Sequence, residues 1–330
     1  MVNNLLNQIG NTPLIKLKQV SEMTGCNIYG KAEFFNPGES VKDRAALFII
    51  SDAIKNNKIQ EGGTVVEGTA GNTGIGLALV CKVFKLNLKI VIPKTQSIEK
   101  KNLLRKLNAD LIEVDAVPYK NPKNYIKQSK EIAEELLKTN KNGVLWANQF
   151  DNILNTEAHI KTTSQEIWSQ TAGKIDGFTC AVGTGGTLAG VSLGLKEKNK
   201  NIKIALSDPM GSSLFSFFKK DKLASVGNSI TEGIGTGRVT KNFDLAKIDE
   251  AYQIDDTEAL NLIFDLKIKQ NIMLGGSSGI NMAGAIRLAK QLGPGHNIVT
   301  ILCDYGNRYA SKILNKEFLK SKNLPIPNWL

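Results

Sequence analysis

Residues 37–44 read Pro37-Gly38-Glu39-Ser40-Val41-Lys42-Asp43-Arg44, and a run of alanine and aliphatic residues follows them (Ala45, Ala46, Leu47, Ile49 and Ile50). A Pro-Gly turn and a serine that can cap a helix predict a turn that delivers Lys42 to the first turn of a helix. The N-terminus of a helix is the positive end of its dipole, which disfavours a cation there. Lys42 is therefore either one of the many solvated lysines of this chain or a lysine that is neutral for part of its working cycle.

The length and composition are those of a globular protein with two domains or one large α/β unit. The chain has 330 residues, of which 42% are hydrophobic and 22% charged, so a sizeable core is expected without help from disulfides or metals. Residues 1–18 contain no apolar leader with a cleavage site, and no later run is long enough to span a membrane. These features predict a cytoplasmic protein that does not bind a membrane.

The cysteines and histidines argue against a disulfide framework and against a metal site. The four cysteines are far apart, form no Cys-x-x-Cys motif, and each lies in or beside an apolar run (Cys26, Cys81, Cys180 and Cys303). We expect buried free thiols in a reducing compartment. His159 and His296 are too few and too isolated for a metal site or a Ser-His-Asp triad, so both are predicted to be structural.

The net charge of +11 raises the possibility of nucleic-acid binding. However, lysine and arginine alternate with acidic residues along the predicted helices, as in residues 127–138, and aromatic residues make up only 6% of the chain. No basic block stands beside clustered aromatic residues. We therefore expect no nucleic-acid partner, and the excess charge suits small anionic substrates better.

Predicted strands and helices alternate along most of the chain. The first series predicts strands at 27–35, 64–67, 88–92 and 110–114, and helices at 75–84, 98–107 and 125–137. The second series predicts strands at 177–182, 203–206 and 297–303, and helices at 188–196, 258–269 and 280–292. Such alternation predicts an α/β protein with two parallel sheets, each flanked by helices, and a cleft between them. Ligands of such sheets bind at the loops that follow the carboxyl ends of strands.

The loop Gly183-Thr184-Gly185-Gly186-Thr187 lies between a predicted strand and a predicted helix. Glycines allow close backbone approach, and consecutive N–H groups at a helix N-terminus bind anions, so we expect a phosphate site. Asp208 lies at a distance that would suit a dinucleotide fingerprint, which keeps a nicotinamide-dependent oxidoreductase open as an alternative. Leu188 replaces the third glycine of that fingerprint, so a single terminal phosphate fits better than a pyrophosphate.

Two further glycine-rich loops precede helices. Thr69-Ala70-Gly71-Asn72-Thr73-Gly74 offers backbone donors of a size that suits a carboxylate, and Gly275-Gly276-Ser277-Ser278-Gly279 offers hydroxyls at a helix start. Each could be no more than a capped turn. A phosphate site, a carboxylate site and a helix-initiating lysine together indicate pyridoxal 5′-phosphate, which needs a phosphate site, an amine and a group opposite its ring nitrogen.

These motifs, in this order and spacing, resemble those of the cysteine synthase (O-acetylserine sulfhydrylase) family of fold-type II pyridoxal-phosphate enzymes. The segments Ile9-Gly10-Asn11-Thr12-Pro13-Leu14 and Asn148-Gln149-Phe150 match as well, so the resemblance covers essentially the whole chain. It implies the tryptophan synthase β-like architecture with the cofactor in a cleft between two domains. The smaller domain would comprise residues 40–152, and the larger one residues 1–39 and 153–330. A homodimer is also implied.

The resemblance implies a role for each motif. Lys42 would carry the internal aldimine and then act as the general base on the substrate α-proton. The cofactor phosphate would be held by Gly183, Thr184, Gly185, Gly186 and Thr187. Asn72 would bond the ring hydroxyl, and Ser277 would face the pyridine nitrogen. The substrate carboxylate would be bound by Thr69, Ala70, Gly71, Asn72 and Thr73 together with Gln149, while Gly233 and Gly235 would belong to a loop that closes the cleft.

The implied reaction is the formation of L-cysteine from O-acetyl-L-serine and sulfide, through loss of acetate to an α-aminoacrylate. A serine opposite the ring nitrogen, unlike an aspartate, cannot stabilise a pyridinium, which favours prompt loss of a β-leaving group over transamination. Many relatives have a serine where this chain has Ala70, which leaves the preferred leaving group open. Cystathionine β-synthase chemistry with homocysteine remains an alternative, as does a non-catalytic binding protein.

Overall fold

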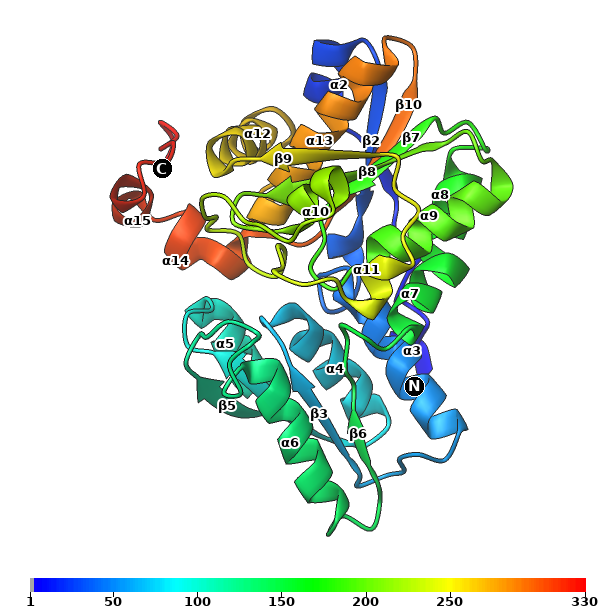
Figure 1. Cartoon of the computed structure of the whole chain (residues 1–330), viewed down its shortest axis with the longest axis vertical. Coiled ribbons are helices and arrows are strands. Elements are labelled where there is room, and N and C mark those ends of the chain that lie inside the picture. Colours follow the sequence, from blue (N-terminus) through cyan, green and yellow to red (C-terminus); the bar gives the residue numbers. More distant parts are fainter. Residues whose placement is uncertain (1–2) are drawn as a thin grey trace.

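The computed structural model describes residues 3–330, which form two sheets flanked by helices (Figure 1). The larger sheet has the strand order β1-β2-β10-β7-β8-β9, and only β1 is antiparallel to its neighbour. Its strands are β1 (Leu14–Lys16), β2 (Asn27–Ala32), β7 (Gly177–Cys180), β8 (Lys203–Pro209), β9 (Glu250–Ile254) and β10 (Asn297–Leu302). The smaller sheet is entirely parallel, in the order β5-β4-β3-β6. Its strands are β3 (Thr64–Gly68), β4 (Asn87–Pro93), β5 (Asp110–Val114) and β6 (Val144–Trp146).

Helices connect and cover these strands. Before β7 they are α1 (Asn3–Leu6), α2 (Lys18–Thr24), α3 (Lys42–Lys55), α4 (Asn72–Val83), α5 (Ile98–Lys106), α6 (Tyr125–Leu137), α7 (Leu154–Ala158) and α8 (Ser164–Gln170). After β7 they are α9 (Gly186–Lys198), α10 (Leu214–Lys220), α11 (Lys241–Asp244), α12 (Asp256–Gln270), α13 (Gly276–Leu292), α14 (Ala310–Ile313) and α15 (Lys316–Ser321). Three short segments have other helical forms: 3₁₀ turns at Glu33–Phe35 and Gly306–Tyr309 and a π turn at His159–Thr163. No described helix is both long and apolar enough to cross a bilayer.

The smaller sheet has helices on both faces, as the alternating pattern predicts. The chain moves outward from β3 to β5 through α4 and α5, and then returns past β3 to β6 through α6. Right-handed crossovers in opposite directions place their helices on opposite faces. Accordingly, α3, α4 and α5 share one apolar core with the sheet, which includes Ile50, Leu77 and Leu104. The helix α6 packs against β3, β4 and β6.

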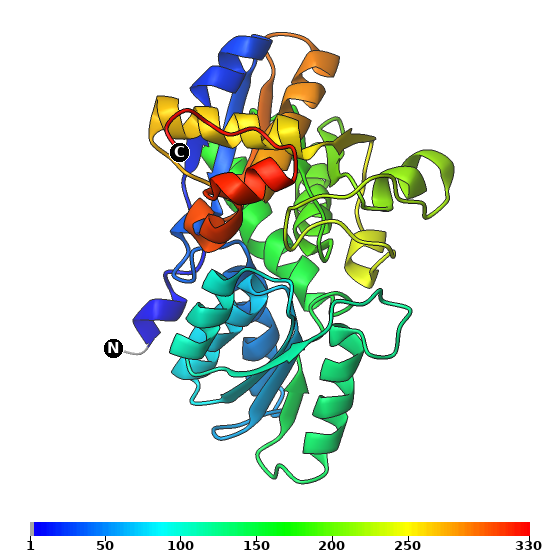
Figure 2. The ribbon, with the colours of Figure 1, turned by 90° about the vertical axis from the view of Figure 1, so that its left-hand side faces the viewer.

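The C-terminal helices connect the two sheets. Figure 2 shows the last part of the chain, in red, lying over α12 and reaching down to the helices of the smaller sheet. The ring of Trp329 packs edge-on against Phe264 of α12, with 5.7 Å between the ring centroids. The helix α14 contacts α5. The cleft between the sheets is therefore bridged on one side by the end of the chain.

Three predicted glycine-rich loops are shorter than the sequence suggested, because the helices begin inside them. The helix α4 starts at Asn72 rather than Ile75, α9 at Gly186 rather than Leu188, and α13 at Gly276 rather than Ile280. The glycines permit close packing there: a Cβ on Gly186 would lie 2.2 Å from Asn155 Oδ1, and one on Gly279 would lie 2.2 Å from the Ala259 carbonyl oxygen. Low helix propensity suggested loops, but tertiary packing overrides it.

Two other local predictions also differ from the structure. The strand expected at 27–35 ends at Ala32 and gives way to a 3₁₀ turn. The cap position of α3 is Val41 rather than Ser40, and it makes no side-chain cap bond. The Ser40 hydroxyl nevertheless accepts a hydrogen bond from the Lys42 N–H at 3.3 Å. Lys42 therefore still lies in the first turn of the helix, as predicted.

Candidate functional site

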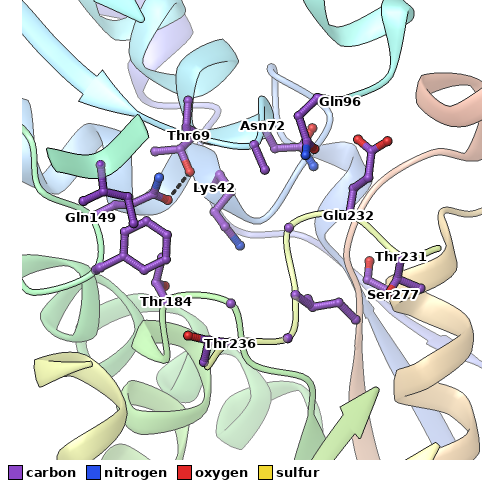
Figure 3. A pocket seen from close by; sticks show the side chains of 18 of the residues that line it. Lys42, Thr69, Asn72, Gln96, Gln149, Thr184, Thr231, Glu232, Thr236 and Ser277 are labelled. Atoms are coloured by element: carbon purple, nitrogen blue, oxygen red, sulfur yellow. Dashed lines mark hydrogen bonds between the residues drawn. The ribbon is translucent and has the colours of Figure 1, made fainter. Parts of the chain in front are cut away.

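A cavity of about 330 Å³ lies between the two sheets, at the carboxyl ends of β3 and β7. All three glycine-rich loops contribute to it together with Lys42, and Figure 3 shows Lys42 pointing into it between Gln149 and Ser277. The predicted site residues that line the cavity are Lys42, Thr69, Ala70, Asn72, Thr73, Gln149, Gly183, Thr184, Gly233 and Ser277. Residues far apart in the sequence therefore meet at one place.

Four predicted site residues do not line this cavity. Gly185 and Thr187 border a smaller adjoining space of about 20 Å³, which Lys42, Gly183 and Thr184 also border. Gly71 and Gly186 line neither space. The loop at 183–187 therefore borders both the cavity and the smaller space beside Lys42.

The backbone around Lys42 is attached to the larger sheet. The Val41 N–H donates to the Cys303 carbonyl oxygen at 3.1 Å, just beyond the end of β10. Ser40 is fully buried and forms an isolated antiparallel bridge with Asp304. Lys42 is the first residue of α3, where unpaired N–H groups and the helix dipole oppose a positive charge. The position thus combines a backbone held by hydrogen bonds with a side chain that lines the cavity.

The loop at 183–187 is shaped by contacts that leave no room for a side chain at its glycines. A Cβ on Gly183 would lie 2.1 Å from the Gly233 carbonyl oxygen, and Gly185 has φ = +91° with the Phe243 backbone nitrogen 2.5 Å from its hypothetical Cβ. The Thr184 hydroxyl accepts a hydrogen bond from Asn155 Nδ2 at 2.9 Å. The loop leads directly into the 13 residues of α9. Its backbone N–H groups and the helix N-terminus together suit an anion.

His159 supports this loop from behind, in agreement with its predicted structural role. Its Nε2 lies 3.1 Å from the Thr187 hydroxyl and its Nδ1 lies 2.8 Å from the Thr163 hydroxyl. Complete burial lowers the pKa of His159 to about 3. The ring is therefore neutral at physiological pH and holds Thr187 through a hydrogen bond.

Gln149 lies beneath the loop at 69–73, and its amide is fully engaged. Its Oε1 accepts a hydrogen bond from the Thr73 hydroxyl at 2.5 Å. Its Nε2 donates to Glu67 Oε1 at 3.2 Å and to the Gly68 carbonyl oxygen at 3.1 Å. The N–H groups of the first turn of α4 have no partner within the helix. In this arrangement the backbone at Asn72 and Thr73, rather than the Gln149 amide, offers the donors for a carboxylate.

Glu67 was not predicted from the sequence, yet it is a buried carboxyl group directly behind Gln149. Burial raises the pKa of Glu67 to about 8, and the hydrogen bonds that it accepts from Gln149 oppose this rise only in part. The folded protein therefore binds a proton at Glu67 between pH about 4.5 and about 8, whereas the unfolded chain has lost it. Stability should fall as pH rises through this window, by at most about 1.4 kcal/mol per pH unit from this group.

Replacing Glu67 with glutamine should flatten the pH dependence of stability. Urea unfolding at several pH values between about 5 and about 8 is expected to give Glu67→Gln a smaller loss of unfolding free energy with rising pH than the wild type. The control is Glu134→Gln, which changes an exposed partner of Lys130. Parallel curves for the wild type and Glu67→Gln would show that Glu67 is not protonated in the folded protein.

The loop at 275–279 brings Ser277 next to Cys303 at the far side of the cavity. Ser277 lies in the first turn of α13, and both residues line the cavity. The Cys303 thiol accepts a hydrogen bond from Asn281 Nδ2 at 3.3 Å, and burial raises the pKa of this thiol to about 11. Cys303 was predicted to be a buried thiol of the core. It is instead half-buried, because β10 ends one residue before it and leaves it at the cavity wall.

The loop at 231–237 is fastened to the smaller sheet by a buried ion pair. Glu232 Oε2 lies 2.8 Å from Lys100 Nζ of α5, and Glu232 Oε1 lies 2.5 Å from Lys312 Nζ of α14. Glu232 also accepts a hydrogen bond from the Ser97 N–H at 3.1 Å. Although burial alone would raise it, the two lysines hold the pKa of Glu232 below its ordinary value. Gly233 follows at once, so this ion pair fixes the loop over the cavity.

A second fastening lies on the opposite side of the loop. Arg238 makes a two-pronged ion pair with Asp151, at 3.1 Å from Nη1 to Oδ1 and 2.9 Å from Nη2 to Oδ2. Its guanidinium also lies over the ring of Tyr119, 4.3 Å from the centroid. Tyr119, Phe150 and Arg238 all line the cavity. None of these contacts could be predicted from the sequence, because each joins residues that are separated by several helices and strands along the chain.

The position of Asp208 argues against the alternative of a nicotinamide-binding site. This side chain is fully buried, accepts a hydrogen bond from the Phe215 N–H at 2.8 Å, and does not line the cavity. A ribose-binding carboxylate would have to face the ligand. Asp208 instead accepts a hydrogen bond from a backbone N–H group at the start of α10. Among residues 3–330, no group of three or more histidine, cysteine, aspartate or glutamate side chains is arranged to hold a metal ion.

Comparison with known proteins adds independent information. The family model described as "Pyridoxal-phosphate dependent enzyme" matches residues 5–304. The chain is 48% identical to "Cysteine synthase 1" of Neurospora crassa, over 98% of this chain and 86% of that protein. It is 37% identical to the cysteine synthase of Staphylococcus aureus, over 94% and 96% of the two chains.

Two solved structures are similar along nearly their whole length. An O-acetylserine-dependent cystathionine β-synthase from Helicobacter pylori superposes with a TM-score of 0.84 at 32% identity, covering 94% of this chain and 98% of that one. A hydrogen sulfide-producing enzyme from Fusobacterium nucleatum superposes with a TM-score of 0.82 at 35% identity, covering 94% and 100%. Both the sequence and the three-dimensional arrangement are thus shared with these proteins.

Proposed function

This chain belongs to the pyridoxal-phosphate dependent enzymes and, within them, to the cysteine synthases, and from that premise we propose which residues form L-cysteine from O-acetyl-L-serine and sulfide. The observation that carries the proposal is the convergence of Lys42, the phosphate loop and the N-terminus of α4 on one cavity. Each of these supplies one requirement of the reaction: an amine, a phosphate site and a carboxylate site.

The cavity fits the cofactor in size and in chemistry. Its volume of about 330 Å³ is within the usual range for small-molecule sites. The loop at 183–187 needs glycine at Gly183 and Gly185, because a Cβ there would collide with the Gly233 carbonyl oxygen or the Phe243 backbone. Gly183, Thr184, Gly185, Gly186 and Thr187 would hold the phosphate, Asn72 would bond the ring hydroxyl, and Ser277 would face the ring nitrogen. When bound, pyridoxal phosphate supplies an electron-withdrawing ring that acidifies the α-carbon of an attached amino acid.

Lys42 is both the attachment point of the cofactor and the base of the reaction. Its Nζ takes the proton from the substrate α-carbon, which requires an uncharged amine at that moment. The Lys42 side chain enters the cavity from the first residue of α3, whose backbone is held by the bond from the Val41 N–H to the Cys303 carbonyl oxygen. Acetate leaves from the β-carbon with the bonding electron pair, sulfide adds at that carbon, and Lys42 Nζ returns the proton to the α-carbon.

The substrate carboxylate binds at the N-terminus of α4. Backbone N–H groups at Asn72 and Thr73 supply the donors, since that of Thr69 is bonded to the Val91 carbonyl oxygen and that of Gly71 to the Thr69 hydroxyl. Gln149 orients the Thr73 hydroxyl through the bond that it accepts. Ala70 contributes no hydroxyl there. The Gln96 side chain, which also lines the cavity, occupies the neighbourhood of the Ala70 carbonyl. Gln96 is therefore the polar side chain that lies beside position 70.

The charges around the cavity favour sulfide over homocysteine as the nucleophile. Within the part of the chain that the structure describes, the cationic residues lining the cavity are Lys42, Lys100 and Arg238. Lys100 is paired with Glu232, and Arg238 is paired with Asp151. Homocysteine would bring a second carboxylate into the site, and no uncommitted cation is left for it. Sulfide needs no such partner.

A competition experiment tests this function. The purified protein should absorb visible light as a yellow holoenzyme and convert O-acetyl-L-serine and sulfide to L-cysteine. Sulfide, thiosulfate, cyanide and homocysteine are then offered in turn after O-acetyl-L-serine has changed the absorption spectrum. Sulfide is expected to restore the starting spectrum at the lowest concentration. Faster restoration by homocysteine would favour the cystathionine-forming alternative, and the absence of any spectral change would contradict catalysis.

The proposal extends to the organisation of the protein. Residues 40–152 form the smaller domain, and residues 1–39 with 153–330 form the larger one. The protein works as a homodimer in the cytoplasm. Four cysteines without a disulfide among them are in keeping with a reducing compartment. Light scattering of the purified protein tests the dimer, and a mass of one chain would contradict it.

A further inference from the structure

Asn72 is clamped by two charged residues on the opposite side of the cleft. Its Nδ2 donates to Asp304 Oδ2 at 2.6 Å, and its Oδ1 accepts from Arg308 Nη1 at 2.8 Å. Asn72 begins α4 beside the smaller sheet, whereas Asp304 and Arg308 follow β10 of the larger sheet. Both charged residues are buried. This contact therefore joins the two halves of the molecule at the wall of the cavity.

The clamp fixes which end of the amide faces which neighbour. A guanidinium can only donate hydrogen bonds, so the Asn72 oxygen must face Arg308. The Tyr309 hydroxyl donates to the same Asp304 Oδ2 at 2.5 Å, which requires this carboxylate to act as an acceptor. Burial and the neighbouring Asp304 raise the pKa of Tyr309 well above its ordinary value, so its hydroxyl keeps its proton. The Asn72 NH₂ group thus has one N–H committed to Asp304 and one left over.

We propose that Asp304 and Arg308 are positioning residues, which hold the Asn72 amide so that its second N–H is presented to the ring oxygen of the bound cofactor. The inference rests on the proposed function, since it assumes that Asn72 meets that oxygen. An unclamped amide could turn by half a rotation and present its oxygen instead, which would repel an oxygen that carries negative charge. The clamp removes this alternative.

The surroundings of Arg308 explain why it stays in place. Its Nη2 donates to the Gly38 carbonyl oxygen, and Glu39 Oε2 lies 3.5 Å from the same nitrogen. Gly38 begins the turn that leads to Lys42. Arg308 therefore contacts both the Lys42 turn and Asn72, so a single side chain sets the relative placement of the amine and the amide.

The test is a double-mutant cycle on cofactor binding. Asp304→Asn keeps the shape of the side chain but replaces the carboxylate that accepts from both Asn72 and Tyr309 with a neutral amide, which weakens the hold on the Asn72 amide. The affinity of the full-length protein for pyridoxal phosphate, titrated back after removal of the cofactor, is expected to fall roughly tenfold, and the absorption maximum of the bound cofactor should shift. Asn72→Ala should have a similar effect, and Asp304→Asn should add little to it.

Controls distinguish loss of the positioning contact from a general loss of structure and from failure of the proposed function. Asp249→Asn changes a carboxylate that pairs with Lys196 away from the cavity, and it should leave both readouts unchanged. Thermal unfolding of each variant identifies any change in stability. Wild-type affinity and absorption for Asp304→Asn, or fully additive effects with Asn72→Ala, would overturn the positioning role. Failure of the wild-type protein to bind pyridoxal phosphate would instead overturn the proposed function.

Discussion

Replacing Lys42 with alanine is expected to lower the rate of cysteine formation by roughly 10³- to 10⁴-fold, because the amine that removes the substrate α-proton is lost. The phosphate loop does not depend on this side chain, so the variant should still bind pyridoxal phosphate. Steady-state assays with O-acetyl-L-serine and sulfide give the rate, and the absorption spectrum reports the bound cofactor.

The location of the covalent attachment can be checked in the same set of proteins. Borohydride treatment of the wild type followed by mass spectrometry should find the cofactor on the peptide that contains Lys42. The matched control is Lys82→Ala, which removes an exposed lysine in the last turn of α4. Turnover of Lys42→Ala within tenfold of the wild type, or modification of a different lysine, would contradict the assigned role.

Replacing Glu232 with alanine is expected to destabilise the protein by about 3 to 5 kcal/mol, because it leaves the Lys100 charge buried without a partner. The Lys100 side chain is only 1% exposed and that of Glu232 only 4% exposed. The neighbouring Lys312 and the Ser97 N–H would lose their acceptor as well. Urea unfolding of the holoenzyme measures the change in the free energy of unfolding.

A second variant separates the charge from the packing. The double replacement Lys100→Met with Glu232→Gln removes the buried charge and keeps an oxygen for the Ser97 N–H, so it should be less destabilised than Glu232→Ala alone. Glu61→Ala serves as the control, since it breaks an exposed pair with Lys85 and should change stability by less than about 1 kcal/mol. A change of similar size for Glu232→Ala and Glu61→Ala would show that the buried pair does not stabilise this loop.

Much of the fold could be predicted from the sequence, because the alternation of apolar strands with amphipathic helices is a local signal. The helix at 125–137 and the strand at 110–114 have the expected bounds. The position of Lys42 at the start of a helix was also predictable from the turn before it. The starts of α4, α9 and α13 were not, because glycine is a poor helix former and only contacts with distant segments reveal why it is there.

Only those parts of the candidate site that lie in glycine-rich loops could be predicted from the sequence. The glycine-rich segments could be recognised from their composition, and the loops that follow parallel strands lie at one edge of the sheet. Glu232 and Lys100 lie 132 residues apart, and Asn72 and Asp304 lie 232 residues apart. In the sequence these are ordinary charged residues among many. Only the fold shows that they are buried and paired, which is why the fastening of the loop and the clamp on Asn72 escaped prediction.

The central position of β10 has a consequence for how the protein is made. This strand pairs with β2 on one side and β7 on the other, although it follows β7 by more than a hundred residues. During synthesis the four strands of the smaller sheet emerge together and can fold as a unit, whereas β2 and β7 must wait with open edges until residue 302 has left the ribosome. Nascent chains that stop earlier would present two unpaired edges to other chains. Ser277, Cys303 and Asp304 are also made late, so the site cannot form before residue 304 has been synthesised.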